Sequence, residues 1–390
     1  MRAIIQDLYW RACQYPWYIA VNIGFAVVFY LLSIQFGRLL RILLAERIFR
    51  LSLTTQPAFM AFVFDTLIAY VVLTCLFVLI SVPVLFHKGI VFTIIGYTLY
   101  FWFLFFPAHL FFGLFAGKPW TVDMKLPIVI FASILLAICA LSLFYFPNQI
   151  QTRFLTFRTR KITRPVRIVH LSDIHADNYG VREAHVVSLV NRTNPDLILI
   201  TGDMFVTPYE YNRRGINAAR RILEQLHTTK GIYLIEGHHD EGKVHRLVKG
   251  MGDKVKFLHD THDYIKDNDN TIFLFGTSLE SKVTAHEHKN ETDSYSIYLA
   301  HNPKIRRNLK DSSFDLALFG HTHGSQVYIP IVSYFITGKC RHGLYEYAGI
   351  PLYVNAGIGM EGYLAPRIRW FTYPEVVVID LIPESSEPTN

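Results

Sequence analysis

The stretch YLIEGHHDEG, residues 233–242, places two adjacent histidines between a glycine and an aspartate. The apolar run in front of them, Tyr233 to Ile235, is typical of a buried β-strand. Histidines at the carboxyl end of such a strand are loop residues, metal ligands or acid–base catalysts. The neighbouring strands of the same domain decide among these three roles.

From Val166 onward, short β-rich runs alternate with helical ones. The predicted strands are RIVHL (167–171), DLILI (196–200), GIYLIE (231–236), TIFLFG (271–276), YSIYLA (295–300), DLALFG (315–320), PLYVN (351–355) and EVVVIDL (375–381). Helical spacing of apolar residues predicts helices over 182–193 and 216–229. Alternating strands and helices predict a layered α/β domain, in which chemistry lies at the carboxyl ends of the strands.

Asp or His follows five of these strands, often beside a glycine that allows a tight turn. The residues are Asp173 and His175, Asp203, the run His238, His239 and Asp240, then His301, and finally His321 and His323. One histidine at a strand end is usually a loop residue, but five successive strand ends of this kind indicate a common rim. Imidazoles and carboxylates that converge there predict a site for transition metals such as Zn, Mn or Fe.

The N-terminal third has a different composition. Hydrophobic residues make up 51% of the chain and aromatic residues 15%, above the usual level for a soluble protein. The excess lies in four nearly charge-free runs, residues 17–36, 66–86, 89–115 and 126–146. Each has about the 20 residues that a membrane-spanning helix needs. We therefore predict a four-helix transmembrane region over residues 1–150.

An even number of spans puts both termini on one side of the membrane. The balance of Lys and Arg in the connecting segments favours the cytoplasm for that side. Cys340 is the only cysteine of the C-terminal part, so no disulfide forms within it, which fits a reducing compartment. The prediction is an integral membrane protein whose C-terminal domain lies in the cytoplasm.

Composition also places the domain boundaries. Residues 151–165 interleave arginines with apolar residues and are predicted to be a basic juxtamembrane linker, either a solvated strand or a segment that lies on anionic headgroups. Residues 166–382 form the α/β domain, and residues 383–390 a disordered tail. The net charge of +7 fits a membrane surface, and no nucleic-acid-binding motif is present.

The ordered blocks DIH, GD, GHHD, AH and GHTH resemble the pattern of the calcineurin-like metallophosphoesterases, D-x-H, G-D, G-N-H-[D/E], H and G-H-x-H. The resemblance covers roughly residues 165 to 382 and implies a metallophosphoesterase β-sandwich flanked by helices. The segments GHTHGSQVYIP, GLYEYAGIPLYVNAGIG and YPEVVVIDL are most similar to the membrane-associated branch of the family. That branch includes transmembrane bacterial phosphoesterases and hydrolases of UDP-diacylglucosamine.

The resemblance implies two divalent metal ions, Mn, Zn or Fe, and a role for each residue. The first ion would be held by Asp173, His175, Asp203 and His323, and the second by Asp203, His238, His301 and His321. A hydroxide shared by the two ions would be the nucleophile. His239 would protonate the leaving oxygen, and Asp240 would orient the His239 imidazole.

His238 departs from the family pattern, which has asparagine at this position. If His238 binds, the second metal gains a third imidazole and its preference moves from Mg toward Zn, Fe or Mn. If its longer side chain misses the metal, the second site weakens, and one-metal chemistry or inactivity follows. The presence of every other ligand favours ligation.

Two functions follow from these patterns. The first is a membrane-anchored phosphoesterase, a hydrolase of phosphodiester or pyrophosphate bonds, whose substrate is a phospholipid or a nucleotide-sugar lipid. The second is a non-catalytic membrane scaffold or sensor whose phosphoesterase-like domain binds a ligand without turnover. The complete set of ligand residues favours the enzyme. We assign no nucleic-acid partner and no oligomeric state.

Overall fold

The computed structural model describes residues 101–115, 122–206, 213–267, 270–279, 294–328, 333–334, 340–361 and 367–384, with single positions between 66 and 99. The chain divides into two compact units. The first comprises residues 1–145 and 361–368, and the second comprises residues 146–360 and 369–390.

The described part of the first unit is helical and apolar. It contains the π-helix η4 (Phe101–Phe105), α5 (Phe106–Phe115), α6 (Val122–Ala140) and the π-helix η5 (Leu141–Tyr145). Within the described residues, the helical stretch Lys125–Asn148 is long and apolar enough to cross a membrane, with a mean hydropathy of 2.7 over its most apolar window. Large apolar side chains of α6 lie on its outside, among them Ile130, Phe131 and Ile134. A soluble helix would expose polar residues there.

This finding bears on the four predicted spans. The predicted span 126–146 lies within Lys125–Asn148, and the end of the predicted span 89–115 contains a shorter apolar helix, Phe101–Phe111. The span 17–36 and most of 66–86 lie outside the described residues. A four-helix transmembrane region is therefore not confirmed, and it stays a prediction.

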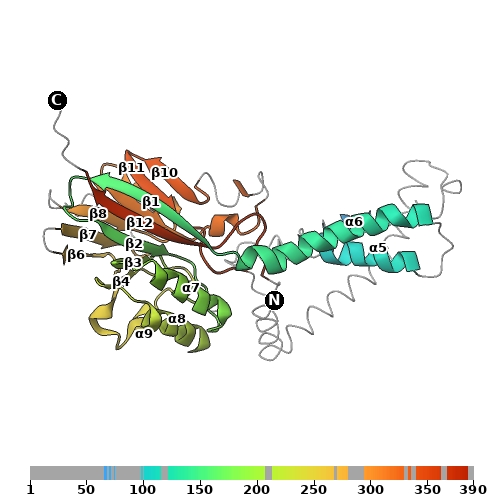
Figure 1. Cartoon of the computed structure of the whole chain (residues 1–390), viewed down its shortest axis with the longest axis horizontal. Coiled ribbons are helices and arrows are strands. Elements are labelled where there is room, and N and C mark those ends of the chain that lie inside the picture. The colour runs from blue at the N-terminus through green and yellow to red at the C-terminus, as the bar shows by residue number, and fades with distance from the viewer. Residues whose placement is uncertain are drawn as a thin grey trace. The chain divides into compact units, whose positions relative to one another are not determined.

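The second unit is built on two six-stranded sheets (Figure 1). The first sheet has the order β1 (Gln151–Thr159), β12 (Glu375–Pro383), β2 (Val166–Leu171), β3 (Leu197–Ile200), β4 (Ile232–Leu234), β5 (Val255–Phe257). The second has the order β10 (Gly343–Tyr347), β11 (Ile350–Val354), β9 (Leu316–Phe319), β8 (Tyr295–Leu299), β7 (Asn270–Gly276), β6 (Thr261–Asp267). Strands β2 to β5 are parallel to one another, and so are β7, β8, β9 and β11.

Helices α7 (Val181–Arg192), α8 (Arg213–Gln225) and α9 (Val244–Val248) are joined by short segments to strands of the first sheet. Figure 1 shows all three on the same side of that sheet. Short 3-10 turns are formed by η6 (Phe146–Asn148), η7 (Gly252–Lys254), η9 (Pro303–Leu309) and η10 (His323–Ser325). The predicted helices 182–193 and 216–229 are thus confirmed, with shifted ends.

The core follows from the two-residue periodicity of the strands. In β2 and β3, Val169 and Ile200 pack against the helices, whereas Ile168 and Leu199 face the second sheet. The layer between the sheets also contains Leu274 and other apolar residues of the second sheet. Both faces of the first sheet are therefore buried, which explains why its strands are continuous apolar runs. The predicted layered α/β domain is confirmed.

Residues 151–165 are not a linker. Residues 151–159 form β1, an edge strand that pairs in parallel with β12 along its whole length. Leu155 and Phe157 pack against the core between the sheets, whereas Phe154, Thr156 and Arg158 at the intervening positions are exposed. Burial that alternates residue by residue is the period-2 pattern of a half-buried strand.

Candidate metal centre

The loops that follow β2, β3, β4, β8 and β9 bring all of the predicted ligand residues to one rim of the sandwich. Within these loops Asp173, His175, Asp203, His321 and His323 have φ between 45° and 71°. This left-handed region is costly for residues with a side chain, and such strain gathers at functional sites. The fold holds these five side chains in place against their local backbone preference.

Asp173, His175 and His323 form a first group of ligand atoms that lie within 4.8 Å of one another. All three side chains are fully buried. The Nε2 atoms of His175 and His323 are 3.0 Å apart, and Asp173 Oδ1 lies 3.5 Å from His323 Nε2. Asp173 Oδ1 has no hydrogen-bond partner among the described residues. Two ring nitrogens and one such oxygen therefore face a common point.

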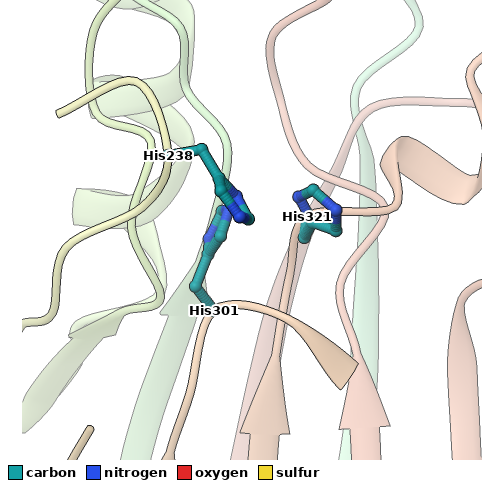
Figure 2. Close-up of side chains that lie close together, drawn as sticks. All are labelled: His238, His301 and His321. Atoms are coloured by element: carbon teal, nitrogen blue, oxygen red, sulfur yellow. The ribbon is translucent and has the colours of Figure 1, made fainter. Parts of the chain in front are cut away.

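His238, His301 and His321 form a second group, again with ligand atoms within 4.8 Å (Figure 2). Figure 2 shows the three rings gathered around one space, each from a different loop. The His238 ring centroid lies 4.6 Å from that of His321 and 5.1 Å from that of His301. His301 Nδ1 donates to the carbonyl of Thr201 at 2.7 Å, which leaves Nε2 for the site. Such a bond fixes the tautomer and orientation of a ligand imidazole.

Asp203 lies between the two groups. Its Oδ2 is 3.2 Å from His301 Nε2 and 3.7 Å from His175 Nε2, so one carboxylate oxygen faces both groups. Its Oδ1 accepts the backbone N–H of His239 at 2.7 Å. Oδ2 is buried and accepts no well-directed hydrogen bond from the described residues. Asp203 is thus placed to bridge two cations.

The charges of the site fit the binding of cations. Burial alone would raise the pKa of Asp203, but the charges of His301, His239 and His175 outweigh it and hold the pKa well below its usual range. Burial alone would lower the pKa of His301, but Asp203 raises it to about 10. A proton on His301 thus balances Asp203 when no cation is bound, and a cation that takes its place releases that proton.

His321 shows the opposite behaviour. Burial and the charge of His301 hold its pKa well below the usual range, so the imidazole stays neutral. A neutral imidazole is the form that binds a metal. Together with the buried carboxylate oxygens of Asp173 and Asp203, this donor set fits divalent transition-metal ions.

His239 and Asp240 follow directly after His238. The His239 ring centroid is 4.7 Å from that of His175, and His239, His175 and Asp203 offer atoms within 4.8 Å of one another. The predicted role of Asp240 in orienting the His239 imidazole stays a prediction, and the structure gives Asp240 a further one. Its carboxylate accepts the backbone N–H groups of Met204 and Gly237, so it ties the loop after β3 to the loop after β4.

Residues outside the sequence motifs hold the backbone of Asp173, a member of the first group, in place. The backbone N–H of Gly359 donates to the carbonyl of Asp173 at 2.6 Å. The fully buried Arg369 donates from Nη2 to the carbonyls of Ala356, Gly357 and Gly359. Arg369 therefore fixes the loop 355–359, whose Gly359 in turn binds the backbone of Asp173. The segment NAGIG, residues 355–359, indicates the loop in the sequence, but no sequence pattern indicates the role of Arg369.

Gly320 shows how closely these loops approach. A Cβ atom there would collide with Ser172 and with the carboxylate of Asp173. Ser172 Oγ donates to Asp173 Oδ2 at 2.5 Å, and His321 N donates to the same oxygen at 2.8 Å. Only glycine leaves room for this carboxylate between the two sheets.

The sequence profile of the family described as calcineurin-like phosphoesterase matches residues 166–325. The uncharacterized metallophosphoesterase YkuE of Bacillus subtilis is 28% identical over 254 residues, which cover 60% of this chain and 86% of YkuE. The phosphodiesterase YaeI of Escherichia coli is 27% identical, and the aligned region covers 56% of this chain and 83% of YaeI. A transmembrane protein with metallophosphoesterase domain from Danio rerio is 29% identical, over 50% of this chain and 49% of its own length.

These matches and the rim of Asp and His residues define the class. The second unit contains a calcineurin-like metallophosphoesterase domain. The chain is therefore a hydrolase, and calcineurin-like phosphoesterases depend on metal ions.

Proposed function

We propose that the protein is a membrane-anchored two-metal phosphodiesterase that hydrolyses a phosphodiester or pyrophosphate bond of a lipid-linked substrate. The observation that carries the proposal is the pair of ligand groups joined by Asp203, all on one rim of the sandwich. The space between the His238, His301 and His321 rings is surrounded by nitrogen donors, as a metal of intermediate softness requires (Figure 2).

In this proposal Asp173, His175 and His323 hold one cation, His238, His301 and His321 hold the other, and Asp203 bridges them. Two divalent cations neutralise charge on phosphoryl oxygens and activate a water molecule at neutral pH. The remaining chemistry belongs to the chain. His239 gives a proton to the leaving oxygen as its bond to phosphorus breaks.

The position of His239 supports its role as the acid. Its side chain is only partly buried, whereas Asp203 beside it is fully buried, so a substrate can reach the imidazole. The hydrogen bond from His239 N to Asp203 Oδ1 fixes the backbone of the acid to the bridging ligand. Proton donor and phosphoryl site therefore keep a constant separation, which is the positional precision that general acid catalysis requires.

His238 is the residue that tests which metals the second group accepts. His238→Asn replaces a nitrogen donor with the oxygen donor of the family pattern, and is expected to keep turnover while shifting the preference from Zn, Fe or Mn toward Mg. His238→Ala removes the donor and is expected to weaken the second site. Metal titrations followed by turnover compare the three proteins, and superimposable titrations would show that His238 does not bind metal.

The location proposed for the protein is the bacterial inner membrane, with the catalytic domain in the cytoplasm. The apolar helix Lys125–Asn148 supports a membrane anchor, and the name of the zebrafish relative supports a transmembrane architecture. The name of the Escherichia coli relative, a phosphodiesterase, supports the type of bond. An anchored enzyme and a lipid substrate share one surface, which raises the effective concentration of each for the other.

The experiment for this function uses the full-length protein in liposomes. We expect hydrolysis of bis(p-nitrophenyl) phosphate with added Mn²⁺ and none after chelation, and hydrolysis of phospholipids or nucleotide-sugar lipids in the same vesicles. Turnover of the chromogenic ester without turnover of any lipid in a broad panel would refute the lipid substrate. Ligand binding without turnover of either class would favour the scaffold or sensor.

A further inference from the structure

The segment that leads into β12 connects an exposed aromatic surface to the metal centre. Trp370 N donates to the carbonyl of Gln326, and Tyr328 N donates to the carbonyl of Trp370, both at 2.9 Å. Thr372 Oγ1 also donates to the Gln326 carbonyl, at 2.5 Å. Gln326 comes three residues after the ligand His323. Displacement of the segment 370–372 would therefore be transmitted to the loop that carries a metal ligand.

Four aromatic residues cluster on this segment and form what we call the aromatic collar: Phe146, Trp370, Phe371 and Tyr373. The ring centroid of Phe146 lies 5.4 Å from Trp370, 5.6 Å from Phe371 and 5.4 Å from Tyr373. Trp370 and Phe371 are 4.4 Å apart. Phe146 is buried, whereas Phe371 is 58% exposed. The buried ring of Phe146 thus packs against the exposed ring of Phe371.

Phe371 also has an unfavourable backbone conformation. Its φ is 52°, in the left-handed region that asparagine and glycine adopt far more readily than a bulky aromatic residue. A domain surrounded by water would gain from asparagine here, because the strain would be relieved and no apolar ring would face water. A phenylalanine that is both strained and exposed indicates that its ring has a partner in the working protein.

The collar is continuous with the membrane anchor of the proposed function. Phe146 belongs to the phosphoesterase unit and also to the apolar stretch Lys125–Asn148. Tryptophan and tyrosine are enriched where a membrane meets water. The partner that fits an aromatic surface at the end of an apolar helix is therefore the lipid surface.

Two arginines beside the collar fit the same partner. Arg341 stacks over the ring of Tyr328, with the guanidinium carbon 3.9 Å from the ring centroid. The Arg153 side chain is 55% exposed, and its Nε lies 3.9 Å from Glu375. Arg341 is half-buried and also donates from Nη1 to the carbonyl of Gly324, so Arg153 is the more exposed cation of the two. Cations that remain accessible beside interfacial aromatic residues attract anionic headgroups, at about 1 kcal/mol each near the surface.

The geometry points to the aromatic collar as a lipid-docking surface that places the His323 loop at the level of the headgroups. Phe371 inserts among the lipids, Trp370 and Tyr373 lie at the interface, and Arg153 and Arg341 contact anionic headgroups. The substrate then reaches the metal rim from the membrane. This inference rests on the proposed membrane anchor and names the surface of the catalytic unit that contacts the lipid.

The direct test measures immersion depth in full-length protein in liposomes of phosphatidylcholine with phosphatidylglycerol. A nitroxide is attached at Phe371→Cys, after replacement of the native Cys13, Cys75, Cys139 and Cys340. We expect collisions with oxygen to exceed those with a water-soluble nickel chelate. The matched control is Arg160→Cys, beyond the far end of the nine-residue strand β1, about 30 Å away along the strand. A label at position 371 as accessible to the chelate as the label at 160 would refute the docking surface.

A second test separates docking from a structural role. Phe371→Asn removes the ring and relieves the backbone strain, so the melting temperature in detergent should stay the same or rise. Turnover of vesicle-borne substrate should fall about tenfold, as expected for the loss of one buried aromatic side chain at the interface. Turnover of soluble bis(p-nitrophenyl) phosphate should not change, and Phe371→Trp should behave as the native protein.

The outcomes are distinguishable from a failure of the proposed function. Equal losses on vesicle-borne and soluble substrates, or a lower melting temperature for Phe371→Asn, would assign Phe371 to structure and refute docking. If no lipid is hydrolysed at all, the depth measurement at position 371 still decides the docking surface, because it does not depend on turnover.

Discussion

Replacement of His239 with alanine is expected to lower kcat by about 10²- to 10⁴-fold, the usual contribution of a general acid. The metal content should not change, because His239 belongs to neither ligand group and all residues of both groups remain in place. The backbone N–H of residue 239 still donates to Asp203, since that bond does not involve the side chain. Turnover and elemental analysis on the same preparation give the two quantities.

The leaving group makes this prediction specific. Nitrophenolate leaves without a proton, so His239→Ala should affect a nitrophenyl ester much less than an alkyl ester. The matched control is His245→Ala, an exposed histidine of α9, which should affect neither substrate. An equal loss on both esters, or none on the alkyl ester, would assign the acid to another residue.

Replacement of Asp203 with asparagine is expected to have the largest effect on the metal centre. The amide keeps the shape of the side chain but removes the charge and one oxygen donor from the position that faces both His301 and His175. A single carbonyl oxygen cannot replace a bridging carboxylate, and uncharged donors hold divalent cations more weakly. We expect loss of at least one of the two metals.

The activity of Asp203→Asn should fall by at least as much as that of His239→Ala, roughly 10³-fold or more, since the cations supply the main electrostatic stabilisation. Asp253→Asn, an exposed aspartate of η7, is the control and should keep full metal content and turnover. A native metal content in Asp203→Asn would show that Asp203 does not bridge.

The structure brings the predicted ligand residues together because they obey a rule of parallel sheets, and their roles in metal binding and catalysis stay predictions. Each predicted ligand follows a buried strand, and the carboxyl ends of parallel strands meet at one edge of their sheet. Asp203 follows β3 of the first sheet, whereas His301 and His321 follow β8 and β9 of the second. The chemical type of each side chain is visible in the sequence. The distances between them, which decide that Asp203 lies between the two groups, depend on the packing of the two sheets.

Residues that act through the backbone were harder to predict. Arg369 binds three carbonyls of the loop 355–359, and no periodicity or motif marks an arginine for that role. The motif assigns Asp240 to His239, which stays a prediction, but it does not indicate that the Asp240 carboxylate also accepts the backbone N–H groups of Met204 and Gly237. The interleaved arginines and apolar residues of 151–159 are compatible with a solvated strand and with a segment on anionic headgroups, and only the pairing with β12 shows that they form an edge strand of the sheet.

The central claim is that the two ligand groups joined by Asp203 hold two cations. The most direct measurement is the metal-to-protein ratio of the full-length protein, loaded with Mn²⁺ or Zn²⁺ and freed of excess metal by gel filtration. The proposed centre predicts a ratio close to two. A ratio that stays at one or below after loading with either metal would contradict it.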